Sequence, residues 1–363
     1  MSSEEPSPIA SSIAIAGAGI IGLSIAWRLA QRGWRVTVFD KGAAGGEASL
    51  AGAGMLPPGG EIDAPSELAS LAIESRKLYP SFVRELTAAT KLPIDFQECG
   101  ALDLAFSDRE LQALESRASR QAELGIESKP VQPQEIRASW PRLNSDKLSG
   151  ARFYPDDAFV NPREVVLALA SACRQLGVSI VQVCAVRSAR VGRGSVSLET
   201  GDGAYRHRAL VVAAGAWSDS IDLAGVPDTP FSEPVKGHLI GYQQPPQTCS
   251  TIVRHAHTYL LQRASGLLIV GSSTERVGFR RDLDPSIVSS LARRAEMLLP
   301  HLAKTSPSET WAGFRPGSDA LHIGPWHSNR LYLAYGHLRN GILLAPITAN
   351  RIAAEIQARL GTP

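Results

Sequence analysis

One segment near the start of the chain constrains the fold more than any other. Residues 13–40 read IAIAGAGIIGLSIAWRLAQRGWRVTVFD, so a short apolar run precedes three glycines, an apolar helical stretch and a second apolar run. The spacing of Gly17, Gly19 and Gly22 is typical of dinucleotide-binding turns, where a tight bend, a close pyrophosphate and a close helix–strand contact each exclude a side chain. The following helix N-terminus offers free N–H groups to phosphate. We therefore predict a strand, turn, helix and strand that bind a dinucleotide.

Asp40 and the residues after it narrow the kind of dinucleotide. Asp40 follows Gly22 by 18 residues and ends the second predicted strand. A carboxylate there accepts ribose hydroxyls and repels a 2′-phosphate, which argues against NADP. The fingerprint alone does not separate NAD from FAD. The run from Gly45 to Met55 is small and glycine-rich, so its bare backbone suits close approach of a flat ring system; a flexible surface loop is the alternative.

Further short apolar runs predict where the rest of the sheet comes from. Ala209–Ala214 and Leu331–Ala334 lead into glycines as Ile13–Ala16 does, the middle one at Gly215, and Arg35–Phe39 is a fourth run. Parallel strands covered by helices on both faces are continuously apolar. One sheet would therefore be assembled from the beginning, the middle and the end of the chain.

The stretches between these runs have a different character. Residues 90–150 and 228–308 mix strand-like runs, such as Ala101–Phe106 and Tyr259–Gln262, with amphipathic helices, one of which begins at Asp284. We expect two helices to pack against sheets through these residues: Leu68, Leu71, Leu78, Phe82 and Leu86 in one, and Ile287, Leu291, Ala295 and Leu298 in the other. We predict an α/β protein with a discontinuous nucleotide-binding domain (11–90, 150–227 and 308–363) and an inserted, mostly antiparallel substrate-binding domain (91–149 and 228–307).

The charge balance excludes some classes of partner. Lysine and arginine number 37 against 35 aspartates and glutamates, a formal net charge of +2, so nothing favours nucleic acid binding. The apolar run from Ile13 to Ala30 is interrupted by glycines and Arg28, which makes it a poor membrane span. Glu4 and Glu5 stand where a signal peptide would carry basic residues. We expect a cytoplasmic protein that binds neither nucleic acid nor a membrane.

Several catalytic and metal-binding patterns are missing from the sequence. The His255-x-His257 pair is too closely spaced for two ligands on a helix face and has no acidic neighbour, so we predict no metal. No G-x-S-x-G, H-E-x-x-H or P-loop occurs, which argues against hydrolases and nucleotide triphosphatases. Four cysteines lack C-x-x-C spacing and are read as ordinary thiols of a reducing compartment: Cys99, Cys173, Cys184 and Cys249.

Five blocks carry a resemblance to a known family. They are GAGIIG at 17–22, GEASLAGAGML at 46–56, PVKG at 234–237, WAGFRPG at 311–317 and GHLRNGILLAP at 336–346. With them the chain resembles, over nearly its whole length, the glycine oxidase branch of the D-amino acid oxidase family of FAD-dependent amine oxidases, which serves thiamine biosynthesis in bacteria. The resemblance implies noncovalent FAD, a Rossmann-like FAD-binding domain and a homo-oligomer such as a tetramer. It also implies oxidative deamination of glycine, sarcosine or small D-amino acids by oxygen, giving an oxo acid, ammonia or amine, and hydrogen peroxide.

The resemblance carries cofactor contacts to particular positions. Asp40 would contact the ribose, Val186 would give a backbone contact on the adenine side, and residues 337–343 would lie under the isoalloxazine. The helix predicted at Ile342–Leu360 would then aim its N-terminus at the flavin and favour the negative charge of its reduced form. The full expected set is Gly17, Gly19, Ile20, Ile21, Gly22, Asp40, Ala48, Ser49, Ala53, Gly54, Met55, Val186, Gly215, His337, Leu338, Asn340, Gly341, Ile342 and Leu343.

Substrate residues follow from the chemistry of an amino acid. Its carboxylate is a fixed handle, and an arginine fork holds a carboxylate through two parallel hydrogen bonds. The resemblance matches Arg315 and Arg339 to residues that bind the substrate carboxylate, and Tyr259 to an active-site tyrosine. Arg315, in a turn restricted by glycine and proline, is the first choice. A surface salt bridge is its structural alternative, and ordinary half-buried packing is the alternative for Tyr259.

Two positions depart from the family pattern. Arg254 stands where the resemblance predicts an aromatic residue, and Thr274 where it predicts an apolar residue near the substrate. Both put the identity of the amine in doubt and leave FAD binding untouched. Three other functions remain open: a flavin amino-acid dehydrogenase that passes electrons to a quinone or dye, a non-catalytic FAD-binding sensor or subunit, and an NAD-dependent dehydrogenase.

Overall fold

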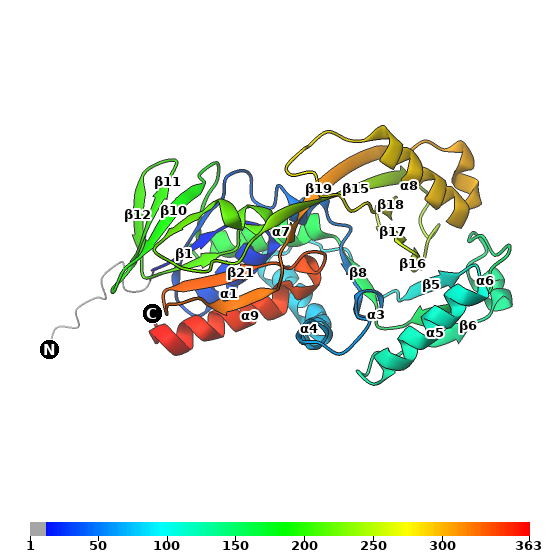
Figure 1. Ribbon diagram of the computed structural model, residues 1–363, viewed down its shortest axis with the longest axis horizontal. Helices are drawn as coiled ribbons and strands as arrows, with labels where there is room; N and C mark the ends of the chain where they lie inside the picture. The colour runs from blue at the N-terminus through cyan, green and yellow to red at the C-terminus, as the bar shows by residue number, and fades with distance from the viewer. Residues whose placement is uncertain (1–11) are drawn as a thin grey trace.

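The computed structural model of the chain describes residues 12–363 and has two parts (Figure 1). The expectation built on Glu4 and Glu5 lies outside the described residues. One part is a layered α/β structure that contains both ends of the described chain. The other is a large sheet with its own helices, and the long strands β15 (Glu233–Gln243) and β19 (Glu309–Gly317) run from the first part into it.

A six-stranded sheet forms the centre of the first part. Its order is β20-β21-β13-β1-β2-β9, and every neighbouring pair is parallel except β20 with β21. This arrangement confirms the predicted sheet made from the beginning, middle and end of the chain. The strands are β1 (Ser12–Ala16), β2 (Arg35–Phe39), β9 (Ser179–Val181), β13 (Ala209–Val212), β20 (His322–Pro325) and β21 (Leu331–Tyr335).

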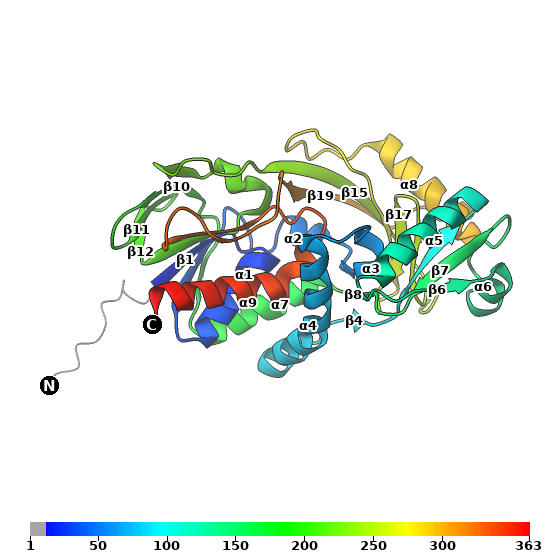
Figure 2. The same ribbon diagram turned by 60° about the horizontal axis from the view of Figure 1, so that its bottom comes forward.

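Different elements cover the two faces of this sheet. Figure 2 shows α1, α7 and α9 side by side along one face, and α4 packs against α7 and α9. A four-stranded sheet of order β12-β11-β10-β14 covers the other face. Burial on both faces explains why the central strands are almost wholly apolar. The covering elements are α1 (Ile20–Gln31), α4 (Glu67–Thr90), α7 (Pro162–Gln175), α9 (Gly341–Leu360), β10 (Val186–Val191), β11 (Val196–Thr200), β12 (Ala204–His207) and β14 (Asp222–Ala224).

The second part is built on an eight-stranded sheet of order β19-β15-β18-β17-β16-β5-β7-β6. All its pairs are antiparallel except β16 with β5, which confirms the expected mostly antiparallel sheet. Its remaining elements are β5 (Ala101–Ala105), α5 (Asp108–Ala122), β6 (Lys129–Val131), α6 (Pro133–Ser139), β7 (Gly150–Tyr154), β16 (Ile252–His255), β17 (Thr258–Gln262), β18 (Leu267–Gly271), α8 (Pro285–Leu298) and the 3-10 helix η2 (Pro300–Lys304).

Short elements lie where the two parts meet. They are α2 (Ala48–Ala51), α3 (Pro58–Glu61), the 3-10 helix η1 (Gly215–Ser220) and a small sheet of β3 (Met55–Leu56), β8 (Ala158–Val160) and β4 (Phe96–Gln97). In both views α3 lies between α4 and α5 (Figures 1 and 2). The strands β7 and β19 pair within the eight-stranded sheet although the predicted boundaries assign residues 150–154 and 309–317 to the other domain. The division into two domains stays a prediction.

The predicted helices occur with one local correction. Asp284 caps α8 by accepting the N–H of Ser286, and Leu291 of that helix is buried. In α4, Phe82 is buried as expected, but Leu68 is 36% exposed, so its assignment to the core is wrong. The cause is that residues 63–68, which lead into the first turn of α4, all lie at the surface.

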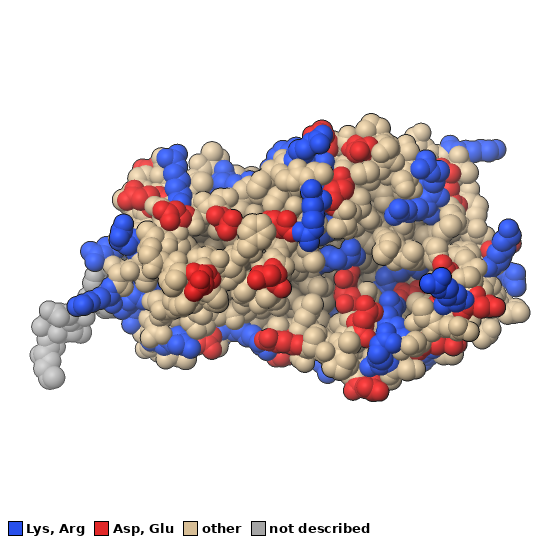
Figure 3. Space-filling model, in the orientation of Figure 1, with Lys and Arg blue, Asp and Glu red and all other residues tan. Residues whose placement is uncertain are grey.

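The surface carries charges of both signs. Figure 3 shows lysine and arginine interspersed with aspartate and glutamate over the face in view. Within residues 12–363, no helix is long and apolar enough to cross a bilayer. In the same range, no group of three histidine, cysteine or acidic side chains is placed to hold a metal. The four cysteines are free thiols, and all but Cys99 are buried.

Candidate active site

The glycine turn between β1 and α1 has the geometry that its sequence predicts. Gly17 has a φ of +111°, and a Cβ there would lie 2.3 Å from the carbonyl oxygen of Ala213, so only glycine fits. The hydroxyl of Ser49 accepts the N–H of Ile20 at 2.9 Å, which ties the glycine-rich run after β2 to the first turn of α1. The turn and this run therefore form one surface.

Asp40 lies at the end of β2 beside that turn. Its carboxylate accepts the backbone N–H groups of Ala18 at 2.7 Å and Gly42 at 2.8 Å. Burial raises the pKa of this carboxyl above its usual value, and the two N–H groups oppose that rise. The carboxylate keeps oxygen lone pairs for a further donor.

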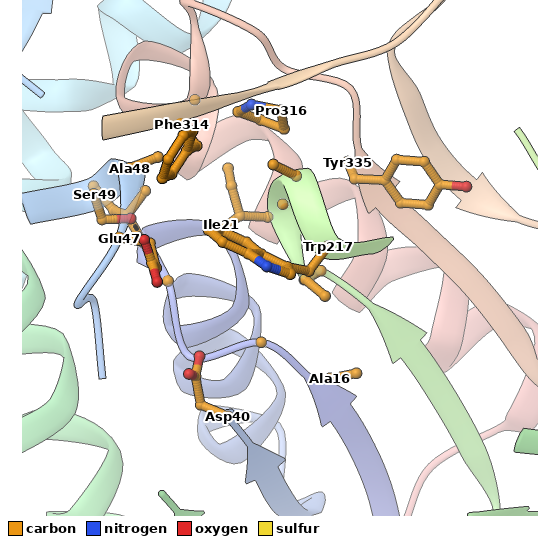
Figure 4. Close-up of a pocket in the computed structure, with 18 of the residues that line it drawn as sticks. Ala16, Ile21, Asp40, Glu47, Ala48, Ser49, Trp217, Phe314, Pro316 and Tyr335 are labelled. Atoms are coloured by element: carbon orange, nitrogen blue, oxygen red, sulfur yellow. Dashed lines mark hydrogen bonds between the residues drawn. The ribbon is translucent and has the colours of Figure 1, made fainter. Parts of the chain in front are cut away.

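A cavity of about 420 Å³ opens between the turn and the rest of the first part. Figure 4 shows Asp40 and Ala16 on one side of it and Phe314 and Pro316 on the other, with Trp217 and Ile21 between. Predicted cofactor residues that line it are Gly17, Gly19, Ile20, Ile21, Asp40, Ala48, Ser49, Val186, Gly215, His337, Leu338, Gly341 and Ile342.

Six of the expected cofactor residues do not line this cavity. Ala53, Gly54, Met55 and Asn340 line a second, smaller cavity instead. Gly22 and Leu343 line neither one: a Cβ on Gly22 would lie 1.9 Å from the carbonyl oxygen of Gly17, so Gly22 serves helix–strand packing. Leu343 is buried in the core.

Sequence reasoning missed an aromatic and charged cluster at the larger cavity. Trp217, on η1, stacks on Phe279 with ring centroids 4.6 Å apart, and the ammonium of Lys41 lies 3.7 Å from the Trp217 ring centroid. Glu47 pairs with Lys41 and with Arg281, each at 2.7 Å. The only signal in the sequence was the position of Trp217 just after the strand-ending glycine at 215.

His337 lies between β21 and α9 and is buried. Its Nε2 is 3.1 Å from the hydroxyl of Thr348, and burial lowers the pKa of its imidazole to about 3. The ring is therefore neutral near pH 7. Gly341 and Ile342, which begin α9, line the cavity as well, so the N-terminus of this helix adjoins it.

The smaller cavity, of about 80 Å³, brings together the three predicted substrate residues. Tyr259 on β17, Arg315 on β19 and Arg339 before α9 all line it. It shares a wall with the larger cavity, made of Ala48, Gly52, Phe314, Arg315, Arg339 and Ile342. Residues that are distant in sequence thus meet beside the larger cavity.

Arg315 is held by neutral groups alone. Its guanidinium donates to the hydroxyl of Ser272 at 2.8 Å and to the carbonyl of Ser273 at 3.1 Å, and no ion pair joins it to a carboxylate of residues 12–363. A Cβ on Gly237 would lie 2.3 Å from this guanidinium, so the glycine of the PVKG block leaves room for it. Burial lowers the pKa of Arg315 below its usual value, and nearby Tyr259 opposes the fall.

Arg339 has a carboxylate partner that the sequence did not reveal. Its Nε lies 3.1 and 3.2 Å from the two carboxylate oxygens of Glu61, and its Nη2 lies 3.0 Å from one of them. Burial acts to lower the pKa of Arg339, but Glu61 more than offsets it and the pKa is raised. Tyr259 is buried, which raises the pKa of its hydroxyl, and the two arginines oppose that rise.

The two departures from the family pattern lie outside both cavities. Arg254 on β16 bonds the carboxylates of Asp103 and Asp157, the latter at 2.5 Å, in a buried cluster. Thr274 is exposed. Neither residue lines either cavity, so the expectation that these changes bear directly on the amine finds no contact to support it.

The fold and the adjoining cavities define a class of protein: an α/β enzyme with a dinucleotide cavity beside a small cavity lined by two arginines. Residues 12–355 match the family DAO, described as FAD dependent oxidoreductase, and this chain belongs to that family. Its cofactor is FAD.

Individual relatives agree with the family over most of the chain. Glycine oxidase of Geobacillus kaustophilus is 31% identical over 351 residues, covering 96% of this chain and 93% of the relative. The bifunctional protein ThiO/ThiG of Synechocystis sp. is 34% identical over 94% of this chain, which spans 51% of that longer protein. The crystal structure of Geobacillus kaustophilus glycine oxidase matches with a TM-score of 0.90 at 31% identity, covering 95% of this chain and 94% of that one.

Proposed function

We propose that this chain is an amine oxidase that deaminates glycine, sarcosine or a small D-amino acid. The products would be an oxo acid, ammonia or an amine, and hydrogen peroxide. The observation that carries this proposal is the guanidinium of Arg315, which pairs with no described carboxylate and lines a small cavity beside the dinucleotide cavity. The relatives named glycine oxidase support the same substrate class.

The residues of the larger cavity fit FAD. The turn at Gly17 leaves no room for a side chain, and the N-terminus of α1 and the Asp40 carboxylate line the same cavity. We propose that the first turn of α1 binds the phosphates and that Asp40 binds a ribose hydroxyl. Bound FAD supplies the acceptor for the hydride that leaves the carbon next to the amine nitrogen.

The residues that line the smaller cavity would orient the amine substrate. We propose that Arg315 binds the substrate carboxylate through both guanidinium nitrogens and that the Tyr259 hydroxyl donates a further hydrogen bond to it. Glu61 is bonded to Arg339 and Tyr259 is neutral, so no residue of 12–363 that lines the smaller cavity is a free base, and the amine would bind in its neutral form. The α9 N-terminus would favour the negative charge of the reduced cofactor.

A spectrum and a peroxide assay test this proposal. The purified chain should be yellow, and under air glycine, sarcosine or D-alanine should yield peroxide, while L-alanine should yield much less. Without oxygen, the same amines should bleach the flavin absorbance. Bleaching without peroxide under air would instead indicate a dehydrogenase with another acceptor, and a yellow protein that none of these amines bleaches would refute the oxidase proposal.

Three further proposals concern the domain boundaries, the cellular location and the oligomeric state of the enzyme. We propose two domains with the boundaries predicted from the sequence, except that residues 150–154 and 309–317 are better grouped with the substrate-binding sheet that they join. We propose a cytoplasmic location, which the free cysteines support. We also propose a homo-oligomer, which gel filtration with light scattering would test.

A further inference from the structure

The residues that line the smaller cavity carry charges that one substrate carboxylate would balance. Its ionisable lining residues are Glu61, Tyr259, Arg315 and Arg339. Arg339 and Glu61 neutralise each other, and Tyr259 is uncharged near pH 7, where a phenol is protonated and burial raises its pKa further. Among residues 12–363, Arg315 is then the one free cation lining the cavity, and its net charge is balanced by a single carboxylate.

The pairing of Arg339 with Glu61 is geometrically close. Three nitrogen–oxygen distances between 3.0 and 3.2 Å join the two side chains, and both carboxylate oxygens take part. The side chain of Glu61 is 19% exposed and that of Arg339 is 36% exposed, so the pair is reached from solvent only in part. A second substrate carboxylate could bind Arg339 only by displacing Glu61 or by lying against it.

Buried side chains also fix the backbone around Glu61. It ends α3, whose Gly59 donates its N–H to Asp157 at 3.1 Å. The fully buried amide of Gln121 donates to the carbonyls of Gly59 at 2.9 Å and of Ile62 at 2.6 Å. Asp157 is in turn bound by Arg254 at 2.5 Å. Because these buried groups fix the backbone on both sides of Glu61, its carboxylate can leave Arg339 only by rotation of the side chain, which breaks the ion pair.

We propose that Glu61 is the specificity-determining residue that limits this site to monocarboxylic amines. By neutralising Arg339, it denies a second carboxylate a free cation, so that carboxylate would lose its hydration without a balancing charge. Specificity of this kind comes from penalising the wrong ligand as well as from binding the right one. The inference deepens the proposed amine oxidase function and rests on it.

Two substrates of nearly the same shape isolate the effect of the second carboxylate charge. Iminodiacetate and its monoamide, N-(carbamoylmethyl)glycine, have nearly the same shape, but only the first carries a second carboxylate. For wild type, kcat/KM should be at least about tenfold higher for the monoamide, since close charge pairs at such sites interact by more than 1.4 kcal/mol. For Glu61→Gln, the ratio should shift at least about tenfold toward iminodiacetate.

Two further variants give the controls. Glu98→Gln removes another paired carboxylate, bound to Arg76 at 2.9 Å and outside both cavities, and should keep the wild-type ratio. The double variant Glu61→Gln/Arg339→Gln should lose the shift, because the gain needs a free Arg339. Each ratio compares two substrates on one preparation, so partial loss of flavin cancels. Where an amine is not oxidised, its inhibition constant against glycine replaces kcat/KM.

The outcomes separate this inference from the function on which it rests. A yellow wild-type protein that oxidises no small amine would refute the proposed function. If glycine is oxidised, but wild type accepts iminodiacetate as well as the monoamide, the inference is overturned while the function stands. The same holds if Glu61→Gln leaves the ratio unchanged, or if the double variant keeps the shift.

Discussion

Replacing Arg315 should weaken the use of carboxylated amines without removing the cofactor. Its guanidinium is oriented by Ser272 and Ser273 and lies beside the space for the substrate. Truncating one partner of a buried, hydrogen-bonded charge pair costs about 2–5 kcal/mol. At about 1.4 kcal/mol per factor of ten, Arg315→Ala should lower kcat/KM for glycine by about 30-fold to several-thousand-fold.

Arg315→Lys tests the geometry of the arginine rather than its charge. Lysine keeps the positive charge but has no planar fork, so it cannot bond Ser272 and Ser273 while presenting two N–H groups to a carboxylate. Losing one charged hydrogen bond costs about 1.5–3 kcal/mol, which is a fall of about tenfold to a hundredfold in kcat/KM.

The assay compares peroxide release from glycine and from glycinamide, which lacks the carboxylate, with flavin content and melting temperature measured on the same samples. Both variants should remain yellow and folded, and glycinamide should be affected much less than glycine. Equal losses for the two amines would show that Arg315 supports the fold or the flavin. The carboxylate assignment would then have to be abandoned for this residue.

Three other substitutions test separate parts of the site. Asp40→Ala should weaken FAD binding by about 1–3 kcal/mol, and unchanged flavin retention on dialysis would contradict the ribose assignment. Tyr259→Phe should raise the KM for glycine about fivefold, for a loss of about 1 kcal/mol, with flavin retained; an unchanged KM would leave Tyr259 a packing residue. The pKa of His337 is lowered to about 3 in the folded protein, so its stabilisation is present above pH 6.5 and is lost as the pH falls toward 3. Between pH 7 and 4.5, wild type should therefore lose about 2.5 kcal/mol more unfolding free energy than His337→Gln, and parallel urea curves for the two would contradict this.

Local patterns in the sequence were enough to predict β1, β2, β13 and β21 of the central sheet, but not β9 and β20 at its edges. A strand covered on both faces has no solvent side, so Ile13–Ala16 and Leu331–Ala334 are apolar without alternation. Gly17 and Gly22 are each required by a backbone contact, Gly17 with Ala213 on the neighbouring strand and Gly22 with Gly17 a few residues before it. The same locality explains why the sequence alone predicts Asp40 beside the turn.

Long-range pairing explains what the sequence did not reveal. Glu61 and Arg339 are 278 positions apart, and neither has a neighbour in sequence that indicates its partner. Arg254 stands where the resemblance predicts an aromatic residue, but β16 pairs with β5 in a register that sets Arg254 opposite Asp103, and its side chain bonds that carboxylate. Which side chains pair in this way depends on strand register and on packing between the two parts, which no short motif encodes.

The strand order of the central sheet determines when a cofactor site can exist during synthesis. β1 and β2 emerge early, but β13 receives its outer neighbour only when β21 at residues 331–335 has been made, and α1 is covered only when α9 follows. Until then the nascent chain carries an open strand edge and bare apolar helix surface, which are the features that make incomplete chains aggregate. A chain that still lacks β21 and α9 therefore cannot enclose FAD. Productive folding should therefore depend on protecting that incomplete sheet from aggregation until the final segment is made.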